Sequence, residues 1–142
     1  MGSNFIKQKI QYSKLNAKQQ ESYNFQKISA VLADYGYTTI KLDDDWEGAD
    51  FIAMKNSNQQ SSFIKVQLKG RLTIAKKYLG KELYIGFPIK DNWFLVPHDE
   101  IVGFIRDHSP KTLSTSSWVQ GGVYSWNNLS KSIREELGQY KL

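Results

Sequence analysis

The sequence predicts an α/β (α+β) domain in which helices flank a central mixed sheet. Three observations support this class. An amphipathic helical pattern comes first, three extended segments follow it, and strand-like and helix-like segments are mixed after them. The chain has 142 residues, of which 40% are hydrophobic and 23% are charged, as in an ordinary globular domain. We therefore expect residues 1–142 to form one domain.

Residues 14–35 are predicted to form the opening helix. Asn16 and Gln19 have the spacing of a capping pair at its start, and Gly36 is a typical stop after its end. Apolar residues recur along it at helical spacing: Phe25, Ile28, Leu32 and Tyr35. This stripe predicts that one face of the helix packs on the core.

Three extended segments are predicted after this helix, at residues 37–42, 50–55 and 63–69. β-branched residues favour a strand in the first segment, and apolar and polar residues alternate in the third. The polar stretch 56–62 is typical of a turn, so the second and third segments are expected to form a hairpin.

The rest of the chain is expected to add smaller elements. Residues 83–89 and 93–96 have strand patterns, and residues 97–107 have a short helical one. In the C-terminal part, residues 110–142, Gly121 and Gly122 suggest the turn of a hairpin between Trp118 and Trp126. A terminal helix is expected over residues 130–140. The tryptophans are expected to pack in the core.

Basic side chains are concentrated in residues 61–90. The whole chain carries a net charge of +5, but this segment holds seven basic residues and a single acid, Glu82. Five acids precede it: Asp43, Asp44, Asp45, Glu47 and Asp50. A basic segment beside an acidic cluster suits a polyanion and a divalent cation bound together. A solvated, lysine-rich surface with a solvated acidic loop is the alternative reading.

Several classes of function are excluded by what the sequence lacks. It has no cysteine, so disulfides, zinc-thiolate sites and thiol nucleophiles are excluded. No apolar run reaches the ~18 residues of a membrane helix, and no signal-peptide core begins the chain. We therefore expect a cytoplasmic location without membrane contact. His98 and His108 lack zinc-site spacing, and His98 is expected to serve at a helix start.

Polar residues that could carry chemistry meet on the predicted hairpin. Asp50 opens the second extended segment and is followed by apolar residues, so its carboxylate needs a partner. Lys65, Gln67 and Lys69 share one face of the third segment. Antiparallel pairing would bring Asp50 near Gln67 and Lys69, although a plain cross-strand salt bridge would use similar residues.

Asp50 followed by Gln67-Leu68-Lys69 resembles the motif of the PD-(D/E)XK nuclease superfamily in its Q-x-K variant. That superfamily includes restriction enzymes, archaeal Holliday-junction resolvases and some homing endonucleases. The resemblance covers roughly residues 14–97 and implies a restriction-endonuclease-like α-β-β-β core. The final third of the chain matches no part of the motif.

The resemblance also implies roles for these residues. Asp50 matches the metal-binding aspartate, and Gln67 stands where most members have a second acidic ligand. The backbone carbonyl of Leu68 is the usual additional ligand. Lys69 matches the lysine that orients the attacking water and stabilises developing charge on the phosphate. The cofactor implied is Mg²⁺ or Mn²⁺.

Members with glutamine in the motif often recruit a glutamate from the first helix, and Glu21 is the residue in this position. It falls on the apolar stripe of the predicted helix, where an acid is unusual. An alternative is that Glu21 only complements the helix dipole near the N-terminus.

A nucleic acid, with DNA favoured, is the expected partner. The residues after the motif are placed to contact it: Arg71, Lys76, Lys77, Tyr78 and Lys81. Tyr78 could stack on a base or sugar. A homodimer is expected if both strands of a duplex are cut. Two alternatives to an endonuclease stay open: a nucleic-acid-binding module that has lost the chemistry, and a protein-interaction domain.

Overall fold

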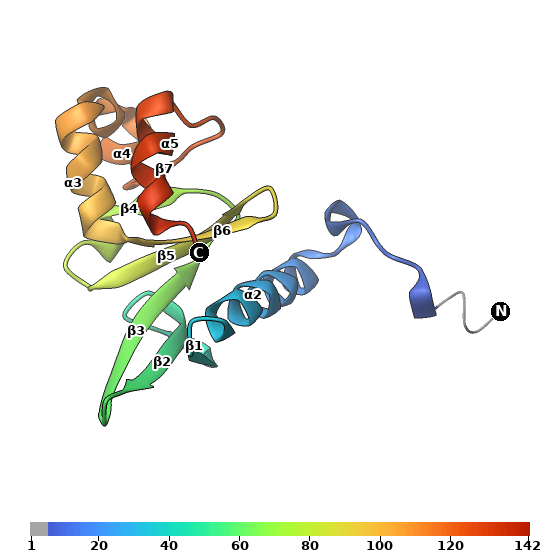
Figure 1. Cartoon of the computed structure of the whole chain (residues 1–142). Helices are drawn as coiled ribbons and strands as arrows, with labels where there is room; N and C mark the ends of the chain where they lie inside the picture. Colours follow the sequence, from blue (N-terminus) through green and yellow to red (C-terminus); the bar gives the residue numbers. More distant parts are fainter. Residues whose placement is uncertain (1–5) are drawn as a thin grey trace.

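The computed structural model describes residues 6–142 and has an α+β architecture (Figure 1). The elements are, in chain order, η1 (Tyr12–Lys14), α2 (Ala17–Ala33), β1 (Thr38–Trp46), β2 (Ala49–Ser57), β3 (Gln60–Leu68), β4 (Thr73–Ala75), η2 (Lys76–Tyr78), β5 (Leu83–Ile89), β6 (Asn92–Pro97), α3 (His98–His108), η3 (Pro110–Ser114), α4 (Ser116–Val119), β7 (Val123–Ser125), α5 (Lys131–Leu137) and η4 (Gly138–Tyr140).

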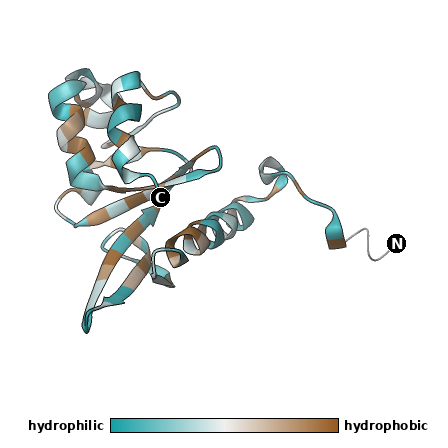
Figure 2. Cartoon of the chain, viewed as in Figure 1, coloured by the Kyte–Doolittle hydropathy of each residue, from teal (hydrophilic) through white to brown (hydrophobic). Residues whose placement is uncertain are grey.

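A five-stranded mixed sheet forms the centre, with the strand order β1-β2-β3-β5-β6. The pairing of β3 with β5 is parallel, and the other three pairings are antiparallel. Brown and teal segments alternate toward the end of β3 in Figure 2, as the period-two pattern of this segment predicts. The expected central mixed sheet is therefore present.

The two faces of the sheet carry separate apolar cores. On one face, α2 packs Ile28 and Leu32 against Phe51 and Val66. On the other face, β5 and β6 pack against α3, α4 and α5, which lie on the opposite side of the sheet from α2 (Figure 1). A Cβ added at Gly86 would lie 2.7 Å from Ile28 Cδ1, so α2 needs glycine there to approach β5.

The opening helix is shorter than predicted, and Tyr35 does not share its buried stripe. Asn16 and Gln19 form the expected capping box, so α2 begins at Ala17 and η1 is a separate turn before it. Gly36 has a φ of +84°, which explains the stop. Tyr35 lies beyond the last helical turn and is exposed.

β1 is longer than the sequence suggested. It runs to Trp46, so Asp43, Asp44 and Asp45 belong to a strand and not to a loop. The register of β1 against β2 shifts between Lys41 and Trp46, which lets these acids continue the strand past the regular pairing.

The hairpin of β2 and β3 has the predicted turn. Asn58 and Gln59 both have positive φ values, of 50° and 64°, as the two central residues of a tight hairpin turn require.

The predicted hairpin between Trp118 and Trp126 is wrong. Trp118 lies in the short helix α4, and β7 pairs with β4 and not with a neighbour in sequence. Both tryptophans are buried, as expected of core residues.

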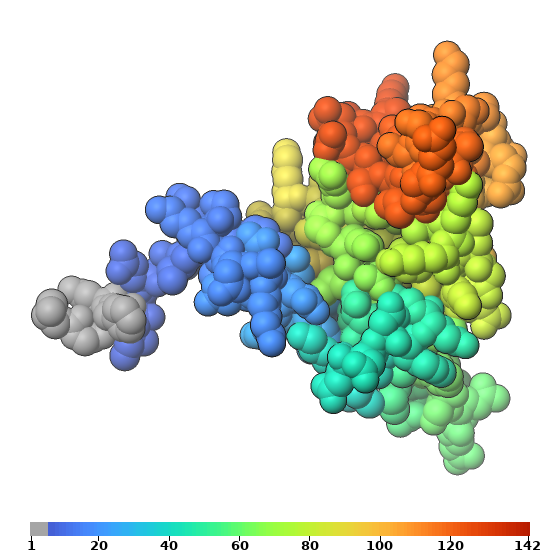
Figure 3. Space-filling view, turned by 180° about the vertical axis from the view of Figure 1, so that it is seen from behind, coloured from blue at the N-terminus to red at the C-terminus, as the bar shows by residue number. Residues whose placement is uncertain are grey.

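Residues 6 to 11 extend away from the body of the molecule (Figure 3), and Ile6 and Ile10 are largely exposed. None of the helices in the described part of the chain has the length and apolarity that crossing a membrane requires.

His98 and Asp99 fasten the segment after β4 to the start of α3. The Nε2 atom of buried His98 accepts a hydrogen bond from the Ala75 N–H at 3.1 Å, and its Nδ1 lies 2.9 Å from Asp99 Oδ1. The other carboxylate oxygen of Asp99 accepts from the Gly80 N–H at 2.9 Å. Burial lowers the pKa of His98 although Asp99 acts in the opposite direction, so the neutral ring that accepts from Ala75 is favoured.

This arrangement predicts a specific pH dependence of stability. The pKa of His98 is lower in the folded state than its ordinary 6.5, so the unfolded chain takes up the proton first as the pH falls. Below pH 6.5 the free energy of unfolding should therefore decrease, by at most about 1.4 kcal/mol per pH unit from this residue. Urea denaturation of the wild type and His98→Phe at pH 7.5 and pH 5.5 measures this contribution.

His98→Phe leaves the Ala75 N–H without its acceptor, which should cost roughly 1 to 3 kcal/mol at pH 7.5. The difference in the free energy of unfolding between His98→Phe and the wild type should be smaller at pH 5.5. His108→Gln, at the exposed end of α3, should keep the pH dependence of stability of the wild type. An equal difference at both pH values for His98→Phe would contradict this role.

Candidate active site

The structure brings Asp50 next to the end of β3. Phe51 pairs with Val66 across the antiparallel hairpin, so Asp50 falls opposite Gln67. One carboxylate oxygen of Asp50, Oδ2, accepts a hydrogen bond from the Leu68 N–H at 2.8 Å. This bond holds the carboxylate beside the residues of the predicted motif. The expected convergence of Asp50, Gln67 and Lys69 at one end of the hairpin is thus observed.

The carboxyl group of Asp50 is half-buried, and burial raises its pKa above the ordinary 3.8. The Leu68 hydrogen bond and the charge of Lys69 act against this rise, whereas the carboxylates of Glu21 and Asp45 add to it. Asp50 is therefore a carboxylate whose surroundings do not fully stabilise its negative charge.

Lys69 follows directly on β3. Its backbone N–H donates to the Gly86 carbonyl at 2.9 Å, which extends the pairing with β5 by one residue. Its Nζ lies 5.7 Å from the centre of the Tyr78 ring. Burial lowers the pKa of Lys69 and so does the charge of Lys77, while Asp50 and Asp45 raise it. Within residues 6–142, neither Lys69 nor Asp50 takes part in a salt bridge.

Gln67 is buried, with an exposed fraction of 9%, and lies between Asp50 on β2 and Ile85 on β5. Its side-chain amide forms no hydrogen bond with any residue in the described part of the chain. No buried side-chain nitrogen or oxygen there lacks a partner, so the amide of Gln67 must reach solvent through a small opening. An amide held in place by a largely buried side chain, with its polar atoms open to solvent, can bind a ligand.

Glu21 lies in the first half of α2, near enough for its charge to raise the pKa of Asp50. The structure corrects one part of its prediction, because Glu21 is exposed and not part of the buried stripe. Only the residues Asn24, Ile28 and Leu32 of α2 are buried. Glu21 is thus an exposed carboxylate whose charge reaches Asp50.

The sequence leaves two readings for Asp45, a part of a cation-binding acidic cluster or of a solvated loop, and the structure places it near the candidate site. Its charge affects the pKa of three groups: Asp50, Lys69 and Tyr78. The register shift in β1 carries Asp45 there, and no local sequence pattern announces such a shift.

Several of the basic residues have other partners in the structure. Lys65 forms an ion pair of 2.7 Å with Glu47 and lies over the Trp46 ring. Arg71 donates to the Asn127 side chain, and Lys76 donates to the Val119 carbonyl. Exposed Lys77 and Lys81 line a hollow beside Asp45 and Tyr78. Of the predicted basic contacts, Lys77 and Lys81 are the two best placed near the site.

The prediction that Tyr78 stacks on a base or sugar is wrong, because its side chain is buried. Burial and the charges of Asp50 and Asp45 raise the pKa of Tyr78 to about 12. Its ring lies 5.7 Å from Lys69 Nζ and 5.3 Å from Lys77 Nζ. Tyr78 therefore holds both lysines near the end of β3 through cation–π contacts.

A divalent cation at Asp50 would have few protein ligands. No group of three or more His, Cys, Asp and Glu side chains that could hold a metal occurs among residues 6–142. Mg²⁺, however, often uses one or two carboxylates and completes its coordination with water and substrate phosphate. Asp50 and Glu21 would supply the carboxylates, and Gln67 and the Leu68 carbonyl would supply neutral oxygens.

No protein-family model matches this chain, and a comparison with curated proteins gives no match either. The candidate site therefore rests on its own geometry and electrostatics.

The electrostatics of Asp50 predict that its charge costs stability. Because its pKa is raised on folding, the cost is present above the folded pKa and is relieved as the pH falls. Asp50→Asn keeps an acceptor for the Leu68 N–H and should raise the free energy of unfolding at pH 7 by roughly 0.5 to 2 kcal/mol. Urea denaturation at pH 7 and pH 3.5 measures this gain, which should be smaller at pH 3.5.

Asp44→Asn is a matched control, because Asp44 is exposed on β1. It should change stability by less than about 0.5 kcal/mol. If Asp50→Asn destabilises the protein at pH 7, the folded protein stabilises the charge of Asp50, and that charge does not cost stability.

Proposed function

We propose that this protein is a metal-dependent endonuclease that hydrolyses phosphodiester bonds of nucleic acid, with DNA the favoured substrate, in the manner of PD-(D/E)XK nucleases. The observation that carries this proposal is the end of β3. A half-buried carboxylate, an amide without protein partners and a half-buried ammonium meet there, and neither charged group forms a salt bridge in the described part of the chain. Groups left in this state are typical of catalytic sites.

Each residue has a role in this proposal. Asp50 and Glu21 would hold Mg²⁺ or Mn²⁺, with Gln67 and the Leu68 carbonyl as neutral ligands. When bound, the cation supplies charge neutralisation at the phosphate and lowers the pKa of water. Lys69 orients the attacking water and stabilises the negative charge that develops on the phosphate oxygens. Its lowered pKa suits a group that also exchanges a proton.

The surroundings of the site support a polyanionic substrate. Lys77 and Lys81 are exposed beside Asp45, and Arg71 lies just beyond Lys69 on the chain. Positive charges at these positions can contact the phosphates on either side of the one that is cleaved. A single site cuts one strand, so cleavage of both strands of a duplex would require a two-fold dimer.

An inactive nucleic-acid-binding module of the same fold is the alternative. The neutral Gln67 favours it, since an amide is a weaker ligand than a carboxylate for Mg²⁺. So does the lack, within residues 6–142, of a cluster of three acidic or histidine ligands. In that case the basic residues would bind nucleic acid and the site would bind no metal.

Cleavage is predicted to depend on Asp50 and Lys69. With Mg²⁺ or Mn²⁺, the wild type should cut at least one of four substrates: plasmid, single-stranded DNA, branched DNA and RNA. Asp50→Ala and Lys69→Met should each reduce the rate by at least about 100-fold, since each removes a group that acts in the transition state.

Asp44→Ala and Lys65→Met are the matched controls for this assay, because they remove an acid and a lysine outside the proposed site. Both should retain activity. Cleavage by Asp50→Ala at the rate of the wild type would show that the site is wrongly assigned.

Metal binding should separate the enzyme from the binding module. In the enzyme, Glu21→Gln removes one of two carboxylates and should weaken Mn²⁺ binding at least about tenfold. Gln67→Glu adds a carboxylate and should strengthen it. Calorimetric titration of the three proteins with Mn²⁺ measures both effects. Unchanged binding in Glu21→Gln would remove Glu21 from the site, and a wild type that binds no metal even with nucleic acid present would support the binding module.

A further inference from the structure

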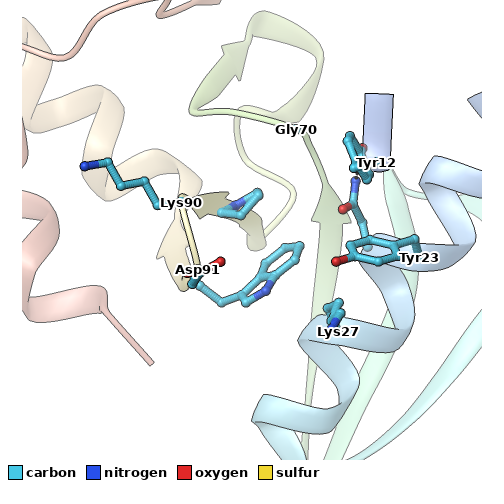
Figure 4. A pocket seen from close by; sticks show the side chains of 9 residues that line it. Tyr12, Tyr23, Lys27, Gly70, Lys90 and Asp91 are labelled. Carbon is cyan, nitrogen blue, oxygen red and sulfur yellow. Dashed lines mark hydrogen bonds between the residues drawn. The ribbon is translucent and has the colours of Figure 1, made fainter. Parts of the chain in front are cut away.

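A pocket of about 470 Å³ lies between α2 and the turn that joins β5 to β6 (Figure 4). Tyr12, Tyr23 and Lys27 lie on its helical side, and Lys90 and Asp91 lie across from them. Gly70 lies between the two sides and is the residue directly after Lys69. The volume is within the range of roughly 300 to 1,000 Å³ that is common for small ligands.

Aromatic rings form much of the lining. Tyr12 and Tyr23 pack against each other, with ring centres 5.3 Å apart and ring planes at 59°. Both are about 40% exposed, so their rings are open to a ligand, whereas the indole of Trp93 is largely buried behind the pocket. Lys27 Nζ lies 5.2 Å from the centre of the Tyr23 ring. Exposed tyrosine rings of this kind are platforms on which bases stack.

Asn24 gives the pocket a polar group of defined direction. It is buried, with an exposed fraction of 9%, and its Nδ2 donates to the Tyr12 hydroxyl at 2.9 Å. Its carbonyl oxygen accepts no hydrogen bond from residues 6–142, and because no buried polar side-chain atom there lacks a partner, this oxygen is accessible to solvent, and Asn24 lines the pocket. A fixed acceptor beside aromatic rings can recognise an N–H on the edge of a base.

The pocket and the candidate active site are neighbours. Glu21, Tyr23 and Asn24 lie within one turn of α2, and Gly70 follows Lys69 in sequence. The turn of β5 and β6 separates the pocket from a second hollow that is lined by Arg71 and Arg134. Positive charge therefore flanks the pocket, through Lys27, Lys90 and these arginines, as a nucleic-acid backbone requires.

We propose that this pocket binds one unpaired base of the nucleic acid whose phosphate lies at Asp50 and Lys69, which rests on the proposed function. A paired base cannot present its hydrogen-bonding edge to Asn24, and its neighbours in the helix occupy its faces. An unpaired base offers both the edge and the faces. The substrate class is thereby narrowed to nucleic acid with an unpaired nucleotide next to the cleaved bond.

The test measures binding without metal, so that it does not depend on cleavage. Two DNA duplexes differ at one bulged position, which carries an adenine in one and an abasic sugar in the other. Fluorescence anisotropy in EDTA should show tighter binding of the adenine bulge to the wild type, by roughly 5- to 100-fold, as for one stacked base. Tyr23→Ala should abolish this preference, and Tyr23→Phe should keep it.

Tyr35→Ala is the matched control, because Tyr35 is also an exposed tyrosine, just after the end of α2, and does not line the pocket. Tyr35→Ala should keep the preference for the adenine bulge.

Equal affinity of the wild type for both duplexes would overturn the proposal. An unchanged preference in Tyr23→Ala would also overturn it, as would a lack of binding to either duplex.

The cleavage assay reports on the proposed function separately. A base preference in a protein that cuts none of the substrates with Mg²⁺ or Mn²⁺ would support the pocket and overturn the nuclease. Cleavage without any base preference would support the nuclease and overturn the proposal for the pocket.

Discussion

The position of β3 in the middle of the sheet is the constraint on which the candidate site depends. β3 is paired with β2 on one edge and with β5 on the other, and apolar cores cover both faces of the sheet. The last residues of such a strand cannot turn fully to solvent, so Gln67 and Lys69 are held partly inside the protein. Placing polar and charged groups there costs stability. Apolar residues at these positions would cost less stability. The presence of Gln67 and Lys69 there therefore indicates a function.

The second half of the chain supports a site whose motif lies in the first half. Tyr78 contacts Lys69 and Lys77, and the segment that carries it is fixed by His98 and Asp99. A Cβ at Gly48 would lie 3.1 Å from the Tyr78 ring, so the turn between β1 and β2 packs closely against the same side chain. Tyr78 thus connects the acidic end of β1, the lysines and α3. The residues after β6 therefore have a structural part in the site although they contain no motif.

The sequence was sufficient for those parts of the fold that depend on neighbouring residues. The capping box of α2, the hairpin of β2 and β3 and the strand β5 follow from local patterns, and Asp50 meets Gln67 because that hairpin fixes the register. Parts that depend on distant residues were not predictable. β4 and β7 are too short to show a pattern and form only because they pair with each other. The burial of Tyr78 and the position of Asp45 likewise depend on packing between distant segments.

Two acid–base pairs near β3 show how the candidate site differs from an ordinary surface. Lys65 and Glu47 lie 2.7 Å apart, and the contact lowers the pKa of Glu47, so each charge is stabilised by the other. Asp50 lies at the start of β2 and Lys69 just after the end of β3, and each lowers the cost of the other's charge. Burial nevertheless outweighs this attraction in both, and their pKa values move toward the neutral forms.

The same region therefore contains one acid–base pair that is satisfied within the protein and one that is not. If Asp50 and Lys69 had only a structural role, a direct ion pair like that of Lys65 and Glu47 would stabilise both charges. In the described part of the chain neither Asp50 nor Lys69 forms a salt bridge, so both charges stay available to atoms that the protein does not supply. A cation and a phosphate oxygen are the atoms whose charges complement this carboxylate and this ammonium. The cost in stability at Asp50 and the proposed chemistry thus have the same physical origin.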